Sequence, residues 1–173
     1  HGPQEKTPAG FSDLLGIKFI NNHFAAVGNQ GTLMFSETGN GWNACSWKEG
    51  YKNALWGITY GDEEYVAVGE YGYIVTSTDG KTWNYERYGP PDEIHLKDVA
   101  FGNDKFVIVG YELSNYDPIA SVLVSTYGDD GREWIRSDFR RQDCHLTKVI
   151  YANGKFFAVG DDDVTYEGIF FMS

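Results

Sequence analysis

The chain has 173 residues, which suits a single domain spanning 1–173. Its formal net charge of −11 at pH 7 argues against nucleic acid and anionic membrane surfaces as partners, because both need clustered Lys and Arg. No stretch approaches the roughly 18 consecutive apolar residues of a membrane span, so no membrane insertion is expected. An aromatic content of 16% together with 21 glycines favours short strands joined by tight turns.

An internal repeat recurs four times along the chain. The segment Leu-Leu-Gly-Ile-Lys-Phe at 14–19 matches the segments at 55–60, 96–101 and 146–151. Fourteen residues after each leading leucine comes the glycine of a Val-Gly pair, at positions 28, 69, 110 and 160. Two landmarks that recur in one phase predict four structural copies, with bounds 14–54, 55–95, 96–145 and 146–173.

Each copy is expected to begin with a β-hairpin, because two apolar runs flank a polar turn. In chain order, the first strands of these hairpins are predicted over 14–19, 55–60, 96–101 and 146–151, and the second over 24–27, 65–68, 106–109 and 156–159. The turns between them are predicted at Asn21-Asn22, Gly61-Asp62, Gly102-Asn103 and Asn153-Gly154. A third strand is clearest over 73–77, and a fourth begins near Trp83. Four short strands in about 40–45 residues are typical of a propeller blade, so the predicted fold class is all-β, a β-propeller of four blades of four antiparallel strands.

The turn between the third and fourth strands of the second copy carries the most specific motif. Its residues, Ser77-Thr78-Asp79-Gly80-Lys81-Thr82-Trp83, resemble the Asp-box, or BNR repeat. An Asp carboxylate can accept backbone N–H groups in such a turn, and Gly takes the positive-φ position. The first copy has Thr38 in place of the Asp, and the third has a degenerate version at 130–134. Together with the Val-Gly strands, the motif is similar to photosystem-assembly-factor-like and sialidase-type repeat proteins.

Residues 1–13 occupy the phase of a fourth strand and its following loop, because His1 precedes Leu14 by the distance that separates Trp42 from Leu55. We expect this N-terminal strand to complete the blade begun by residues 146–173, which removes free sheet edges. Two alternatives stay open. Two chains could pair into an eight-bladed ring, or the chain could be a fragment of a larger propeller. Both a monomer and a homodimer are compatible with the sequence.

The resemblance to sialidases implies an arginine triad drawn from separate blades. Four of the five arginines fall within residues 132–141, which does not fit such a triad, and only Arg87 lies elsewhere. Xyloglucan hydrolases with Asp-boxes place two acids across a long cleft, and no carboxylate pair stands out here. Nothing resembles a nucleophile elbow. No catalytic residue is therefore predicted, and the chain is expected not to be an enzyme.

No cofactor and no metal are predicted either. His95 and His145 hold the same position in copies three and four, but the other two copies have no His there to complete a symmetric cage. The run Asp161-Asp162-Asp163 lacks the spaced ligands of a calcium loop and is interpreted as a solvated acidic loop. The two cysteines have no metal-binding spacing.

Unequal loop lengths indicate one functional face. From the Val-Gly glycine to the third-strand Ser there are 8 residues in copies one and two, but 15 and 13 in copies three and four. In a propeller these insertions share a face with the connections that carry His95 and His145, and insertions on one face often mark a binding face. The alternative is that surface loops vary in length without any function. Trp56 is a separate case: it lies on a predicted innermost strand and either lines the mouth of the propeller channel or plugs the channel. The predicted ligand-binding residues are Trp56, Tyr71, His95, Tyr111, Tyr116, Asp117, His145, Asp161 and Tyr166.

Tyr and Asp side chains suit sugar recognition, because a ring stacks on C–H faces while carboxylates accept hydrogen bonds from hydroxyls. The predicted function is a non-catalytic recognition module that binds a polysaccharide or a protein through one propeller face. A protein scaffold or assembly factor, and the non-catalytic part of a glycoside hydrolase, are the alternatives. The resemblance to Asp-box proteins implies an extracellular or cell-surface location, although fold alone does not establish function.

Overall fold

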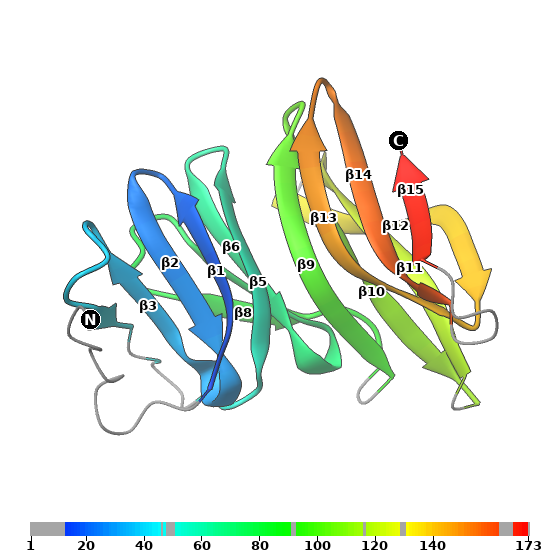
Figure 1. The fold of residues 1–173 in the computed structure, drawn as a ribbon, viewed down its shortest axis with the longest axis horizontal. Helices are drawn as coiled ribbons and strands as arrows, with labels where there is room; N and C mark the ends of the chain where they lie inside the picture. Colours follow the sequence, from blue (N-terminus) through cyan, green and yellow to red (C-terminus); the bar gives the residue numbers. More distant parts are fainter. Residues whose placement is uncertain are drawn as a thin grey trace.

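The computed structural model describes residues 13–45, 47, 51–90, 93–115, 117–128, 131–162 and 168–172. In these ranges the chain forms four antiparallel β-sheets, each built from strands that follow one another in sequence, as in a propeller blade. The first and second blades lie on the left of the molecule in Figure 1, and the third and fourth lie on the right. The helical segments there are two 3-10 turns, Asn29–Gly31 and Glu70–Gly72, and no described helix has the length or apolar character needed to cross a membrane.

The strands follow the predicted repeat. The first blade contains β1 (Leu14–Ile20), β2 (His23–Gly28), β3 (Leu33–Ser36) and β4 (Asn43–Ala44), and the second contains β5 (Leu55–Gly61), β6 (Glu64–Gly69), β7 (Tyr73–Ser77) and β8 (Asn84–Arg87). The third contains β9 (Ile94–Gly102), β10 (Lys105–Ser114), β11 (Asp117–Gly128) and β12 (Gly131–Gln142). The fourth contains β13 (Cys144–Ala152), β14 (Lys155–Asp162) and β15 (Gly168–Met172). The all-β fold with its four blades is confirmed. Closure by residues 1–13 stays a prediction, because residues 1–12 lie outside the described ranges.

The inner hairpins turn through two residues with positive φ, as a type I′ turn requires. In the second and third blades the turns lie one residue later than predicted, because Gly61 and Gly102 end their strands. A Cβ on Gly61 would lie 2.0 Å from the ring of Phe101, and one on Gly102 would lie 2.1 Å from the ring of Tyr151. These two glycines therefore allow the next blade to pack closely. The turn residues are Asn21-Asn22, Asp62-Glu63, Asn103-Asp104 and Asn153-Gly154.

The hydrophobic core is divided among the three junctions between consecutive blades. Each junction buries side chains from the second strand of one blade against the first strand of the next, and the same repeat positions are used each time. The repeat therefore specifies packing between blades as well as the strands within them. The equivalent sets are Val27 with Leu55 and Ile58, Val68 with Leu96 and Val99, and Val109 with Leu146 and Val149.

A buried carboxylate joins the innermost strands of three blades. Asp98, on β9, is 2% exposed, and its Oδ1 accepts a hydrogen bond from Lys18 Nζ on β1 at 2.9 Å. Its Oδ2 accepts one from the backbone N–H of Val149 on β13 at 3.1 Å. A Cβ on Gly57 of β5 would lie 2.7 Å from Asp98 Oδ1, so the second blade also packs against this carboxylate. Asp98 thus links the inner strands of the first, third and fourth blades, and the inner strand of the second blade packs against it.

The insertion in the third copy is a lengthened hairpin rather than a loop. β10 and β11 stay paired from Val107–Val124 to Ser114–Asp117, which satisfies backbone groups that a loop would leave to solvent. Glu112 of the extension forms ion pairs with Arg136 and Arg140 of β12. The extension therefore projects from one end of the third blade as a braced β-ribbon.

Candidate functional site

Six of the predicted ligand-binding residues come together on neighbouring blades, five of them through ring contacts and Asp161 beside His145. His95 lies at the centre of the group, with its ring centroid 4.9 Å from Tyr111 in a stacked arrangement. The centroid of Trp56 is 5.8 Å from His95, and that of Tyr71 is 5.9 Å from it. Tyr111 in turn lies 5.4 Å from His145. We call these five residues, together with Lys97 and Asp161, the aromatic–histidine cluster.

The repeat itself builds this cluster. Tyr111 pairs with His95 across β10 and β9, and Asp161 pairs with His145 across β14 and β13. Both pairs flank the Val-Gly glycine of their blade. A Cβ on Gly110 would lie 2.0 Å from the carbonyl oxygen of His95, and a Cβ on Gly160 would lie equally close to that of His145. The glycines are therefore needed because the backbone carrying each histidine crosses directly over them.

Tyr71 reaches the cluster through a different local device. It lies in the 3-10 turn Glu70–Gly72 with φ 57°, in the left-handed region, while Gly72 follows with φ 72°. The turn is held because the N–H of Glu70 donates to the carbonyl of Ala54 at 3.0 Å and Glu70 Oε2 accepts from the N–H of Ala54 at 3.2 Å. Tyr71 is therefore presented from a turn that is tied to Ala54, the residue just before the strand β5 that carries Trp56.

Lys97 is a residue of this candidate site that the sequence analysis did not predict. Its Nζ lies 3.5 Å from the centroid of the Trp56 ring and 5.5 Å from that of Tyr111, which is cation–π geometry. Burial lowers the pKa of Lys97, while the charge of Glu70 raises it and that of Lys148 lowers it further. The signal was present in the sequence, because Lys97 occupies the same repeat position as Trp56.

The acidic run begins in the last two residues of β14, Asp161 and Asp162, which differ in their surroundings, while Asp163 lies outside the described residues. Asp161 is exposed and lies 3.7 Å from His145 Nε2. Asp162 is buried, accepts a hydrogen bond from Arg141 at 2.8 Å and lies 3.6 Å from the Sγ of Cys144. The prediction of a solvated acidic loop is therefore wrong for Asp162, because β14 extends to this residue and alternation turns its side chain inward.

The remaining predicted residues are not placed in the cluster. Asp117 begins β11 at the far end of the extended ribbon, where it pairs with Ser114. Tyr116 and Tyr166 lie outside the described residues. Within the ranges that the structure describes, no group of three or more His, Cys, Asp or Glu side chains is arranged to hold a metal ion.

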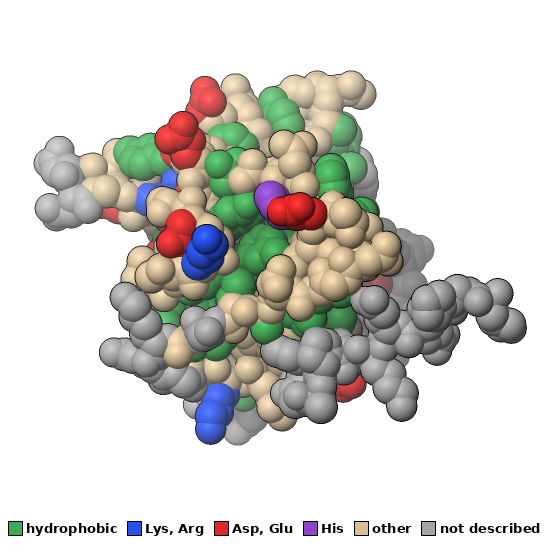
Figure 2. All heavy atoms as spheres, turned by 90° about the vertical axis from the view of Figure 1, so that its left-hand side faces the viewer, with side chains coloured by type: hydrophobic (Ala, Val, Ile, Leu, Met, Phe, Trp, Pro, Cys, Tyr) green, Lys and Arg blue, Asp and Glu red, His purple; other side chains and the backbone are tan. Residues whose placement is uncertain are grey.

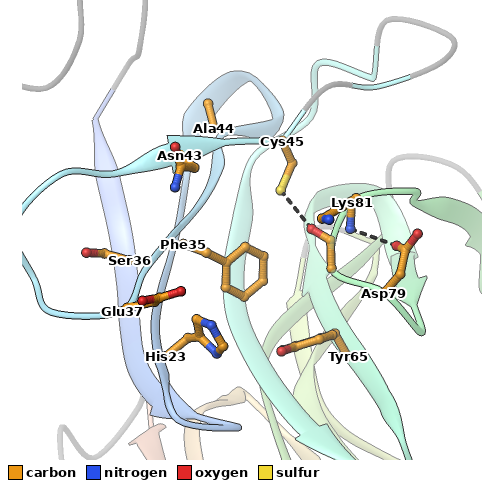
Figure 3. A pocket seen from close by; sticks show the side chains of 11 residues that line it. His23, Phe35, Ser36, Glu37, Asn43, Ala44, Cys45, Tyr65, Asp79 and Lys81 are labelled. Carbon is orange, nitrogen blue, oxygen red and sulfur yellow. Dashed lines mark hydrogen bonds between the residues drawn. The ribbon is translucent and has the colours of Figure 1, made fainter.

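A concave feature lies between the first and second blades, on residues not predicted to bind a ligand. It has a volume of about 420 Å³, and Phe35 points into it between Cys45 and His23 (Figure 3). Cys45 Sγ lies 3.3 Å from the carbonyl oxygen of Gly80, and burial raises the pKa of this thiol to about 11. The lining residues are His23, Phe35, Ser36, Glu37, Asn43, Ala44, Cys45, Tyr65, Asp79, Gly80 and Lys81.

The wall of this hollow on the second blade is the turn that resembles an Asp-box. Asp79 Oδ1 accepts hydrogen bonds from the N–H groups of Lys81 and Thr82, both at 2.7 Å, and from the Ser77 hydroxyl at 3.0 Å. The bonds from Thr82 and Lys81 lower the pKa of Asp79 to about 2. Asp79 Oδ1 therefore holds the turn, which supports a structural role for this residue.

The first copy keeps part of this turn. Its Gly39 N–H donates to Ser36 Oγ at 3.0 Å, as Gly80 does to Ser77 Oγ at 2.9 Å. Thr38 replaces the carboxylate and bonds only to Asn40, at 3.2 Å and 3.3 Å. The serine–glycine half of the turn therefore survives where the aspartate is missing.

No family model and no curated protein sequence matches this chain. Solved structures share its fold. A mutant GH32 β-fructofuranosidase of Bombyx mori, in complex with sucrose, is 13% identical with a TM-score of 0.50, and the match covers 92% of this chain and 45% of the enzyme. The endosialidase of phage phi92 is 15% identical with a TM-score of 0.55 over 84% of this chain and 30% of its own. YCF48 bound to a D1 peptide is 16% identical with a TM-score of 0.48, over 92% and 66%.

The chain thus spans less than half the length of the two enzymes whose fold it shares. These similarities agree with the blade organisation seen in the sheets and establish a propeller-type fold for the chain.

Proposed function

We propose that the chain is a non-catalytic recognition module that binds a polysaccharide through the aromatic–histidine cluster. The observation that carries the proposal is the convergence of three aromatic rings, Trp56, Tyr71 and Tyr111, around His95. Half-buried rings beside polar side chains suit a sugar, because the rings pack on C–H faces while the polar groups meet hydroxyls.

The polar members of the cluster supply both donors and acceptors. His145 and Asp161 lie 3.7 Å apart at its border, and Asp161 is exposed. Lys97, with its pKa lowered by burial, is held against Trp56 rather than extended into solvent. The cluster therefore offers a mixed surface, fitted to a ligand with many hydroxyl groups more than to an extended apolar peptide.

The neighbours in fold add a reason to test carbohydrate first. One was solved with sucrose bound and another is an endosialidase. The serine–aspartate–glycine turn at Ser77, Asp79 and Gly80 adds to this, because we take it to be an Asp-box turn of the kind found in polysaccharide-handling proteins. We propose on the same grounds that the chain works outside the cell or at its surface.

The test is affinity electrophoresis against a panel of neutral and acidic polysaccharides. The wild-type chain is expected to be retarded by at least one of them, and Trp56→Ala or Tyr111→Ala should weaken that binding by about tenfold or more, as for a central aromatic contact. Tyr127→Ala is the matched control, because Tyr127 is an exposed tyrosine of the third blade outside the cluster. Absence of retardation by every polysaccharide, or equal loss in the control, contradicts the proposal.

A further inference from the structure

The two ends of the row of blades each expose one half of the junction that the molecule makes three times internally. On the first blade, Ile17 of β1 is 63% exposed, although Ile58, Val99 and Val149 at the same repeat position are at most 1% exposed. Leu14 and Phe19 on the same strand are also exposed. Figure 2 looks onto this end of the molecule and shows hydrophobic side chains across the middle of the face.

The fourth blade exposes the complementary half. Val159 of β14 is 45% exposed, whereas Val27, Val68 and Val109 at its repeat position are fully buried against the next blade. Ile150 of β13 is 59% exposed. These side chains border a hollow of about 380 Å³ whose apolar lining residues are Val149, Ile150, Ala152, Phe157 and Val159. Contiguous exposed apolar surface of this kind marks an interaction site.

The two faces match each other by position. In each internal junction, the valine before the Val-Gly glycine of one blade packs with the leading leucine and the following β-branched residue of the next. Val159 is that valine in the fourth blade, and Leu14 and Ile17 are those partners in the first. The surface that fits the fourth blade is therefore the one that the first blade exposes.

We propose that these faces dock on a second copy of the chain, with the fourth blade of each copy packed against the first blade of the other. The innermost strands contact one another in the order β1, β5, β9 and β13, so the first and fourth blades are the two ends of this series, and Ile17 and Val159 both stay exposed within one chain. A head-to-tail contact that closes after two copies forms two identical junctions and a ring of eight blades, within the usual range for propellers. In this arrangement each copy supplies the half-junction that the other exposes.

The test is the mass of the full chain in solution, measured by light scattering from about 1 to about 100 µM. The proposal predicts twice the 19.5 kDa of one chain at the upper end. Ile17→Asp or Val159→Asp should each weaken self-association by about tenfold or more, because a charge enters an apolar junction. Ile135→Asp is the matched control, since Ile135 is 53% exposed on β12, a strand that carries none of the residues named for either face.

Mixing the two variants separates head-to-tail pairing from any other dimer. In a dimer of either variant alone, both junctions contain the introduced aspartate. In a mixed pair, the unchanged fourth blade of the Ile17→Asp chain meets the unchanged first blade of the Val159→Asp chain, so one junction is intact. The mixture is therefore expected to recover dimer above the level of either variant alone. A single-chain mass for the wild type at every concentration overturns the proposal, because the faces then belong to another occupant. Dimerisation that is lost in both variants and not recovered on mixing also overturns it, as does equal weakening by Ile135→Asp.

Discussion

Replacing Asp98 with alanine is expected to lower the free energy of unfolding by about 3 kcal/mol. The side chain is 2% exposed and accepts three hydrogen bonds, from Lys18 Nζ at 2.9 Å, from its neighbour Val99 N–H at 2.9 Å and from Val149 N–H at 3.1 Å. The substitution removes the carboxylate oxygen that accepts from the Val149 N–H, a group that belongs to the next blade.

The magnitude follows from what each donor can do without the carboxylate. A buried N–H left without an acceptor costs roughly 1–3 kcal/mol, and the substitution leaves two, on Val99 and Val149. Loss of the carboxylate partner of Lys18 adds little to the cost, because the Lys18 side chain is 31% exposed and its ammonium can be hydrated. Lys18 Nζ also still donates to the carbonyl oxygen of Val99 at 2.8 Å. Lys18→Met should therefore cost less than about 1 kcal/mol.

Urea unfolding of the wild type and both variants measures the two effects. A double variant should lie close to Asp98→Ala alone, since Lys18 has lost its carboxylate partner already. A loss below about 1 kcal/mol for Asp98→Ala would refute the reasoning, because the carboxylate could not then be holding the inner strands together. An equal loss for Lys18→Met would also contradict it, by placing the effect in the ion pair instead.

Three further outcomes are expected. The pKa of Asp79 is lowered to about 2, so its contribution to stability should be complete above its ordinary pKa of 3.8 and be lost as pH falls through about 2. The difference in melting temperature between wild type and Asp79→Asn should therefore shrink from pH 5 to about pH 2. A difference that stays constant over this range would argue against the stabilising role of the carboxylate. Gly110→Ala should destabilise the protein by about 2 kcal/mol or more, because its Cβ would lie 2.0 Å from the His95 carbonyl; unchanged unfolding by urea would contradict that contact. Burial raises the pKa of Cys45 to about 11 and also raises that of Cys144, so mass spectrometry should find both thiols alkylated slowly at pH 8 in the native protein and readily after unfolding, and rapid native alkylation would oppose this.

The strands and blades could be predicted because the information is local and repeated. The leading leucines and the Val-Gly pairs mark a bulged first hairpin in every copy, and the structure shows the register shift at the same place in each. The turn positions were missed by one residue at Gly61 and Gly102. These glycines serve the packing of the next blade, which a turn rule does not consider.

Part of the candidate site was predictable for the same reason. His95 and Tyr111 are cross-strand neighbours beside a landmark glycine, so their phase in the repeat brings them together. Lys97 was missed because its repeat position holds an unlike residue in each copy, and its role appears only when the second and third blades pack. The buried Asp98 and the hollow at Cys45 were missed because both depend on contacts between blades.

The central claim is that a polysaccharide binds at the aromatic–histidine cluster, and the indole N–H signals of the five tryptophans test it most directly. An NMR titration with the retarding polysaccharide should shift the Trp56 signal, assigned by its loss in Trp56→Phe. The signal of Trp83, which is 4% exposed in the junction between the first two blades, should stay in place. Movement of other tryptophan signals with Trp56 unchanged would contradict the account and place the ligand elsewhere on the propeller.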